Sequence, residues 1–133
     1  MEKILLPVDA SERSLKTFDR VRKAYPPEEA EVTLLMVVDS AMHFRTDDEY
    51  ERYRQQRVLE LDEISAHLDG YQVSKVILKG NPANKIVEYA ETNKFDVLII
   101  TRSKRGIFGK MGSVATNIVR QAPNLEIIIL PED

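Results

Sequence analysis

The sequence predicts a single α/β domain, built on a parallel sheet of five strands that alternate with four helices. The chain has 133 residues, which is the usual size of one domain. Short apolar runs alternate with segments of helical periodicity, and those runs are continuous, as in parallel strands covered on both faces. Parallel neighbours need crossover connections, which are almost always right-handed. We therefore treat residues 1–133 as one doubly wound domain.

The first quarter of the chain predicts a strand, a helix and a second strand. Lys3–Val8 (KILLPV) is a short apolar run, and Ser11 can cap a helix whose apolar residues recur every three to four positions. Those apolar residues are Leu15, Phe18, Val21 and Tyr25. Pro26 and Pro27 stop this helix, and the apolar, β-branched run Val32–Val38 (VTLLMVV) follows as the second strand.

The longest predicted helix comes next. Thr46 and Glu49 have the spacing of a capping box, and Gly70 fits the position just after a helix end. One face of this helix carries residues at helical spacing, namely Tyr50, Tyr53, Arg57, Leu61, Ile64 and Leu68. Val73–Lys79 then predicts the third strand.

The third helix and the fourth strand have equally local signals. Asn81 as N-cap and Pro82 at the first helical position open a helix. Its apolar residues include Ile86, Val87 and Ala90. Phe95–Thr101 (FDVLIIT) is the fourth strand.

The last segment combines a polar loop, a helix and an apolar strand. After the loop Arg102–Gly112, Ser113 can cap a final helix, and Leu125–Leu130 (LEIIIL) predicts the fifth strand. At the edge of a sheet, this strand would leave backbone groups unpaired. We therefore expect a homodimer through Leu125–Leu130, although the charges of Glu132 and Asp133 could instead keep the edge monomeric.

Composition excludes several classes of function. Without cysteine there is no disulfide, no thiolate nucleophile and no zinc site with cysteine ligands. A net charge of −3 argues against binding to nucleic acid or to a membrane surface. No apolar run could cross a bilayer, and the first residues lack a signal-peptide core, so we expect a cytoplasmic protein. His43 and His67 have no third ligand at metal spacing, and no catalytic or metal-binding residues are predicted.

Three sequence motifs stand in order along the chain. They are Ile4–Glu12 (ILLPVDASE), Leu34–Val38 (LLMVV), and Gly112–Ala115 (GSVA) followed by Val119–Pro123 (VRQAP). They resemble, in that order, the opening strand with its aspartate loop, the second strand and the closing segment of the universal stress protein family, and the resemblance covers nearly the whole chain. The resemblance implies an adenine-nucleotide α-hydrolase-like fold with sheet order 3-2-1-4-5. It also implies a stress-response role and a dimer through the last strand.

The resemblance also implies a nucleotide site, with one departure from the family pattern. ATP-binding members use an aspartate after the first strand, main-chain groups after the second, and a Gly-x2-Gly-x9-Gly-Ser/Thr loop. The early glycines do not carry over. Counting forward from the strand puts Thr101 and Lys104 in their places, and counting back from Gly112 puts Ile99 and Arg102 there. A side chain at these positions can block the close approach of backbone to phosphate.

Basic side chains can hold a phosphate in place of a glycine cradle. Cations of the loop are Arg102, Lys104, Arg105 and Lys110. A helix start at Ser113 would also favour an anion. We therefore expect ATP with magnesium, or another phosphorylated small molecule, to bind at the crevice. The predicted binding residues are Pro7, Val8, Asp9, Val37, Thr101, Lys104, Arg105, Gly112, Ser113 and Val114.

Three alternatives stay open at this point. In the first, the basic loop is merely solvated, Ser113 is an ordinary cap and Asp9 only organises a turn. In the second, the protein is an ATP-binding switch or a weak ATPase. In the third, side chains of the altered loop close the crevice and the protein works by binding partner proteins.

Overall fold

The computed structural model describes residues 1–9, 14–102, 110–121 and 123–131. Five strands form one parallel sheet in the order β3-β2-β1-β4-β5, which confirms the predicted order. The strands are β1 (Glu2–Pro7), β2 (Ala30–Asp39), β3 (Gln72–Gly80), β4 (Val97–Arg102) and β5 (Glu126–Pro131). The helices are α1 (Ser14–Ala24), α2 (Asp47–Ile64), α3 (Pro82–Thr92) and α4 (Lys110–Arg120), with short 3-10 helices at η1 (Pro27–Glu29) and η2 (Ser65–Leu68). All strand limits lie within two residues of those predicted.

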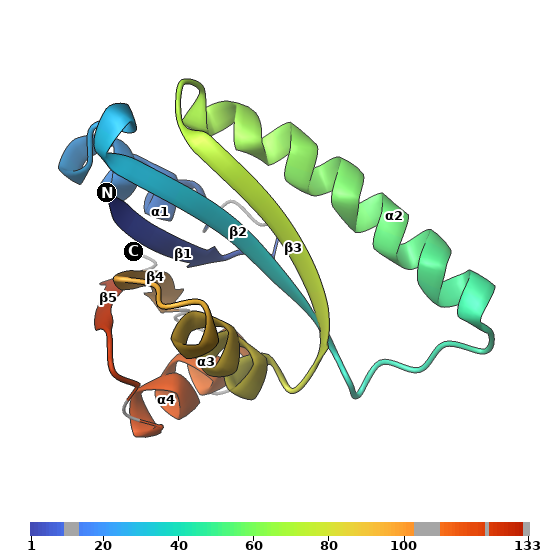
Figure 1. The fold of residues 1–133 in the computed structure, drawn as a ribbon. Coiled ribbons are helices and arrows are strands. Elements are labelled where there is room, and N and C mark those ends of the chain that lie inside the picture. Colours follow the sequence, from blue (N-terminus) through green and yellow to red (C-terminus); the bar gives the residue numbers. More distant parts are fainter. Residues whose placement is uncertain (10–13, 103–109, 122, 132–133) are drawn as a thin grey trace.

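The sheet is the middle of three layers. Helices α3 and α4 cover one face, and α1 covers the other, with α2 alongside the edge strand β3 (Figure 1). On the α1 face, Phe18 and Leu61 are completely buried against the even-numbered apolar residues of β1 and β2. On the α3 face, Ile86 and Ile118 pack against Leu5 and its neighbours. Each such side chain contributes about 1.5–3 kcal/mol by leaving water.

Two predicted helix caps are confirmed. The Glu49 N–H donates to Thr46 Oγ1 at 3.1 Å, and the Asn84 N–H donates to Asn81 Oδ1 at 3.0 Å. Both caps satisfy backbone donors that the first turn of a helix leaves unpaired. The helix after Thr46 is shorter than predicted, because α2 ends at Ile64 and the chain continues as η2.

The start of the last helix differs from the prediction. Helix α4 begins at Lys110, so Ser113 lies inside its first turn and is not the residue before it. Lys110 and Met111 are both good helix formers, which favours extension of the helix back through Gly112. The other predicted serine cap, Ser11, lies outside the described residues.

Candidate functional site

The crevice of this fold lies between β1 and β4. The chain runs outward from β1 to β3 in one direction and from β4 to β5 in the other, so the strand order reverses at this point. Open α/β sheets bind ligands at such a reversal, beyond the carboxyl ends of the strands. Pro7 ends β1 at this edge, and Arg102 ends β4.

Asp9, just after β1, stands at the level of Val37 on the neighbouring strand β2. Pro7 is paired with Leu35, and the Val8 N–H donates to the Leu35 carbonyl at 2.9 Å, so the pairing continues past the end of β1. This register brings Asp9 to the level of Val37 on β2. Asp9 is exposed and Val37 is half-buried, so both can reach a ligand at the edge.

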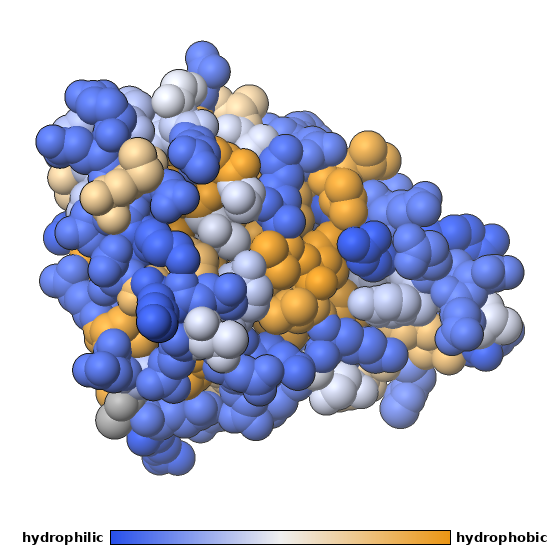
Figure 2. Space-filling model, in the orientation of Figure 1, coloured by the Kyte–Doolittle hydropathy of each residue, from blue (hydrophilic) through white to orange (hydrophobic). Residues whose placement is uncertain are grey.

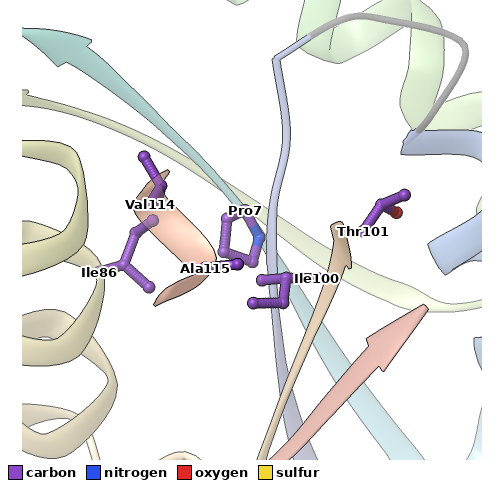
Figure 3. Close-up of a pocket in the computed structure, with 6 residues that line it drawn as sticks. All are labelled: Pro7, Ile86, Ile100, Thr101, Val114 and Ala115. Carbon is purple, nitrogen blue, oxygen red and sulfur yellow. The ribbon is translucent and has the colours of Figure 1, made fainter. Parts of the chain in front are cut away.

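A small apolar hollow lies under this edge. Figure 3 shows its lining residues, which are Pro7, Ile86, Ile100, Thr101, Val114 and Ala115. The hollow is too narrow to hold a water molecule. Three of the predicted site residues, Pro7, Thr101 and Val114, therefore lie close together, and a ligand would sit above the hollow rather than inside it.

Val8 and Thr101 contribute differently from the other predicted site residues. Val8 is 5% exposed and packs in the core on the α1 face. The Thr101 side chain points away from the centre of the hollow (Figure 3), and Thr101 is 4% exposed. Since Ile100 faces α3, alternation along β4 turns the Thr101 side chain toward α1. Only the main chain of these two residues can face a ligand in the crevice.

The start of α4 supplies the electrostatics of the site. Gly112 and Ser113 belong to its first turn, and Val114 and Ala115 border the hollow. A helix start leaves backbone N–H groups without intrahelical acceptors and carries a partial positive charge. An anion is therefore favoured here. The predicted phosphate contacts Lys104 and Arg105 lie outside the described residues.

The turn that follows β2 at the rim of the crevice was not predicted from the sequence. The Ala41 N–H donates to Asp39 Oδ1 at 2.9 Å, and the Ser40 N–H donates to the Gly80 carbonyl at 2.9 Å. Asp39 thus forms an Asx turn that fixes the end of β2, two residues beyond Val37. The Asp-Ser dipeptide after an apolar strand was the available signal. Gly80 has φ +152°, where any side chain would be strained.

An apolar surface continues from the crevice over β2 and β3. Val37, Val76 and Leu78 are half-buried on the α3 side of the sheet, where α3 covers them only in part. Figure 2 shows an apolar area in the middle of this face. A planar apolar group placed beside Asp9 would lie against this surface.

The described residues contain neither a cluster of three potential metal ligands nor a helix long and apolar enough to cross a membrane. His67 stacks on Phe18 with ring centroids 6.0 Å apart, on the α1 face, and takes no part in the crevice. The arrangement that the described residues provide is one for binding, with one exposed carboxylate, an apolar surface and a helix start.

Known proteins resemble this chain throughout its length. A curated relative, the universal stress protein MJ0531 of Methanocaldococcus jannaschii, is 29% identical over 131 residues, which span 91% of this chain and 77% of the relative. The solved structure of the protein MJ0577 has a TM-score of 0.77 at 25% identity, covering 98% of this chain and 95% of that one. A universal stress protein family protein from Arabidopsis thaliana, solved with AMP bound, has a TM-score of 0.68 at 18% identity, covering 100% and 93%.

The sequence model of the universal stress protein family matches residues 1–124, which include every strand up to β4 and all four helices. This match covers far more than half of the chain, and the parallel sheet in the order 3-2-1-4-5 agrees with it. The chain belongs to the universal stress protein family.

Proposed function

We propose that this protein is a cytoplasmic stress-response module that binds an adenine nucleotide in the crevice between β1 and β4. The observation that carries the proposal is that Pro7 of β1 and Val114 of α4 line one hollow at the carboxyl edge, at the reversal of strand order, with Asp9 just beyond Pro7 at the level of Val37. Asp9, the surface beside Val37 and the start of α4 offer a hydrogen-bond acceptor, an apolar surface and a positive helix end, which are the partners that a ribose, a purine and a phosphate need.

Structures of the same fold support this choice of ligand. The Arabidopsis thaliana relative holds AMP, and two further universal stress proteins have been solved with cAMP and with dAMP. Those proteins are 18–19% identical to this chain, so they support the class of ligand and not individual contacts. All three ligands are adenine nucleotides, which makes adenine the base to test first.

Each part of the nucleotide has a candidate partner. The exposed Asp9 carboxylate accepts hydrogen bonds from ribose hydroxyls, and the purine lies on the apolar surface beside Val37. The phosphates lie at the start of α4, and we assign the task of the missing glycines to Lys104 and Arg105, which precede this helix in the sequence. With ATP, a magnesium ion would neutralise part of the phosphate charge.

The proposed working form is a homodimer through β5. This strand forms one outer edge of the sheet, and its apolar residues are only half covered. A second copy that pairs with it would satisfy the outer backbone groups and cover Ile129, which is 41% exposed. Replacing Ile128 by lysine should place unpaired charges at this interface and separate the dimer into monomers. Light scattering measures the resulting mass. An unchanged mass of this variant would reject the interface.

The experiment that tests the proposed ligand uses purified protein in two steps. Heat release and chromatography first identify any nucleotide that copurifies, and calorimetry then measures the binding of AMP, cAMP and ATP, the last with and without magnesium. We expect saturable binding of adenine nucleotides in the micromolar range, and much weaker binding of GTP. No released nucleotide and no heat with any of them would overturn the proposal. Slow release of phosphate from bound ATP would identify an ATP-dependent switch.

A further inference from the structure

The connection from β2 to α2 begins at the rim of the crevice. The chain leaves β2 after Asp39 and leads outward to α2, which lies alongside the edge strand β3 (Figure 1). Two backbone hydrogen bonds tie down the start of this connection. The Ser40 N–H donates to the Gly80 carbonyl at 2.9 Å. The Met42 N–H donates to the Asp39 carbonyl, also at 2.9 Å. Residues 39–42, which we call the rim turn, therefore join the end of β2 to the end of β3.

Aromatic rings tie down the other end of this connection. The ring centroid of Phe44 lies 5.2 Å from that of Tyr50 and 5.3 Å from that of Tyr53, and both tyrosines belong to α2. The Lys79 ammonium of β3 lies 4.9 Å from the centroid of Tyr50 and 5.4 Å from that of Phe44. We call these four residues the aromatic clamp. The clamp fastens the loop to α2 through ring contacts and to β3 through the cation of Lys79.

The charge of Lys79 is held by rings, whereas the charge of Lys75, on the same face of β3, is held by a carboxylate. Lys75 Nζ lies 2.7 Å from Asp62 Oδ1 on α2. Within the described ranges of the chain, Lys79 forms no ion pair. A cation within about 6 Å of a ring centroid is attracted by the negative face of the ring. The ammonium of Lys79 therefore contributes its charge to the aromatic clamp and not to an ion pair.

The aromatic clamp is separated from the rim turn by a single step along β3. Lys79 pairs with Val38. The next residue, Gly80, pairs with Asp39 and accepts the first hydrogen bond of the turn. Lys79 points toward α2, whereas Val37 points toward α3, so the lysine side chain cannot touch a ligand that lies beside Val37. An effect of Lys79 on such a ligand has to pass through the backbone of Gly80 and Asp39.

We infer that Lys79 is a positioning residue for the nucleotide site, because its cation in the aromatic clamp holds the rim turn and thereby keeps the end of β2 in place beside the purine. The inference rests on the proposed nucleotide site and adds a control point outside the crevice. Without the charge of Lys79, β3 loses its hold on Phe44 and Tyr50, and the rim turn opens more often. A purine that binds beside Val37 then has to order the turn as it binds, which lowers its affinity.

Hydrogen exchange measures the opening of the rim turn without any ligand. We expect Lys79→Gln to speed the exchange of the Ser40 and Met42 amides about two- to fivefold, which corresponds to the loss of a cation–π contact at an exposed site. Lys79→Arg keeps a cation over the rings and should restore slow exchange. Lys75→Gln removes a charge from the same face of the same strand and should leave both amides unchanged. Equal exchange in Lys79→Gln and the wild type would overturn the hold of the clamp on the turn.

Calorimetry with AMP and with adenosine, which carries no phosphate, tests the effect on the site. Lys79→Gln should weaken the binding of both ligands by the same factor, about two- to fivefold, and Lys79→Arg should recover the wild-type affinities. Lys75→Gln is again the matched control and should bind both ligands as the wild type does. A loss confined to AMP would overturn the inference, because the lysine would then attract the phosphate through space instead of positioning the turn.

The two measurements separate this inference from the proposal on which it rests. A wild type that binds no adenine nucleotide would refute the proposed site and the positioning role together. A wild type that binds AMP with the same affinity as Lys79→Gln would refute the positioning role alone, whatever the exchange rates, while the proposed site stands. Melting curves of the variants should match that of the wild type, which excludes general unfolding as the cause of faster exchange or weaker binding.

Discussion

The Val8 N–H donates a hydrogen bond of 2.9 Å to the Leu35 carbonyl, and this bond carries the pairing of β1 with β2 up to the residue before Asp9. The bond uses the main chain of Val8, so replacing the exposed Asp9 by alanine leaves it intact. We expect Asp9→Ala to weaken AMP binding about 10- to 100-fold, because hydrogen bonds to a charged group contribute about 1.5–3 kcal/mol. Calorimetry measures the affinity.

The melting temperature of the same variant distinguishes a ligand contact from a turn former. We expect it to stay close to that of the wild type. Asp9→Asn keeps one acceptor oxygen and should lose less affinity than Asp9→Ala. A large drop in melting temperature with unchanged affinity would mean that Asp9 organises the loop and does not contact the ligand.

Lys104 and Arg105 should contribute to the binding of phosphates and not of the base. Replacing both by alanine should weaken ATP binding more strongly than AMP binding, because ATP carries more phosphate charge for the two cations to neutralise. Calorimetry with both nucleotides at two salt concentrations gives the comparison. Arg52→Ala with Arg54→Ala removes two cations from α2 and should change neither affinity. Equal losses for AMP and ATP would contradict a phosphate role.

The sequence predicts best those features that depend on a few neighbouring residues. Thr46 and Asn81 cap their helices as expected, since a cap needs only a side-chain oxygen and a free N–H three residues ahead. The predicted start of α4 was wrong by several residues. Ser113 is only one of several residues at which this helix could begin, and the good helix formers Lys110 and Met111 move the boundary toward the N-terminus.

The side of the sheet to which a residue points was harder to predict. Sequence reasoning placed Val8 and Thr101 in the site together with Pro7, and Thr101 was included because it stands where the family has a glycine. Alternate residues of a strand face opposite helix layers, and the sequence alone does not say which set faces α1 and which faces α3. In this fold Val8 and Thr101 belong to the set that faces α1. Helical periodicity placed Tyr50 and Tyr53 on one face of α2, and both are half-buried there, with ring centroids 5.2 and 5.3 Å from that of Phe44.

Lys94 should be the easiest position at which to stabilise the fold. The Lys94 and Phe95 N–H groups donate to the carbonyls of Glu91 and Ala90 in a Schellman motif, and Lys94 has φ +53°. Glycine adopts this conformation without a Cβ clash. We expect Lys94→Gly to raise the free energy of unfolding by about 0.5–1 kcal/mol in urea titrations. Lys94→Ala keeps the Cβ and should bring no gain. A gain from alanine would point to charge rather than backbone conformation.

Tyr25 should make stability fall in strongly alkaline solution. Burial raises the pKa of its hydroxyl above the ordinary 10.0, and the carboxylates of Glu126 and Glu2 raise it further against the opposing effect of Arg20. The folded state thus holds this proton more tightly than the unfolded state. The stability that the Tyr25 hydroxyl contributes through this pKa difference is fully present below about pH 10. It is lost as the pH rises through the folded-state pKa.

Thermal melts at intervals between about pH 9 and about pH 11.5 measure this effect. Tyr25→Phe cannot ionise, so its melting temperature should fall less steeply over this interval than that of the wild type. Tyr50→Phe, in the aromatic cluster on α2, is the matched control and should follow the wild-type curve. If wild type and Tyr25→Phe decline in parallel, the Tyr25 hydroxyl is equally easy to ionise in the folded and unfolded chains, and the proposed burial effect is absent.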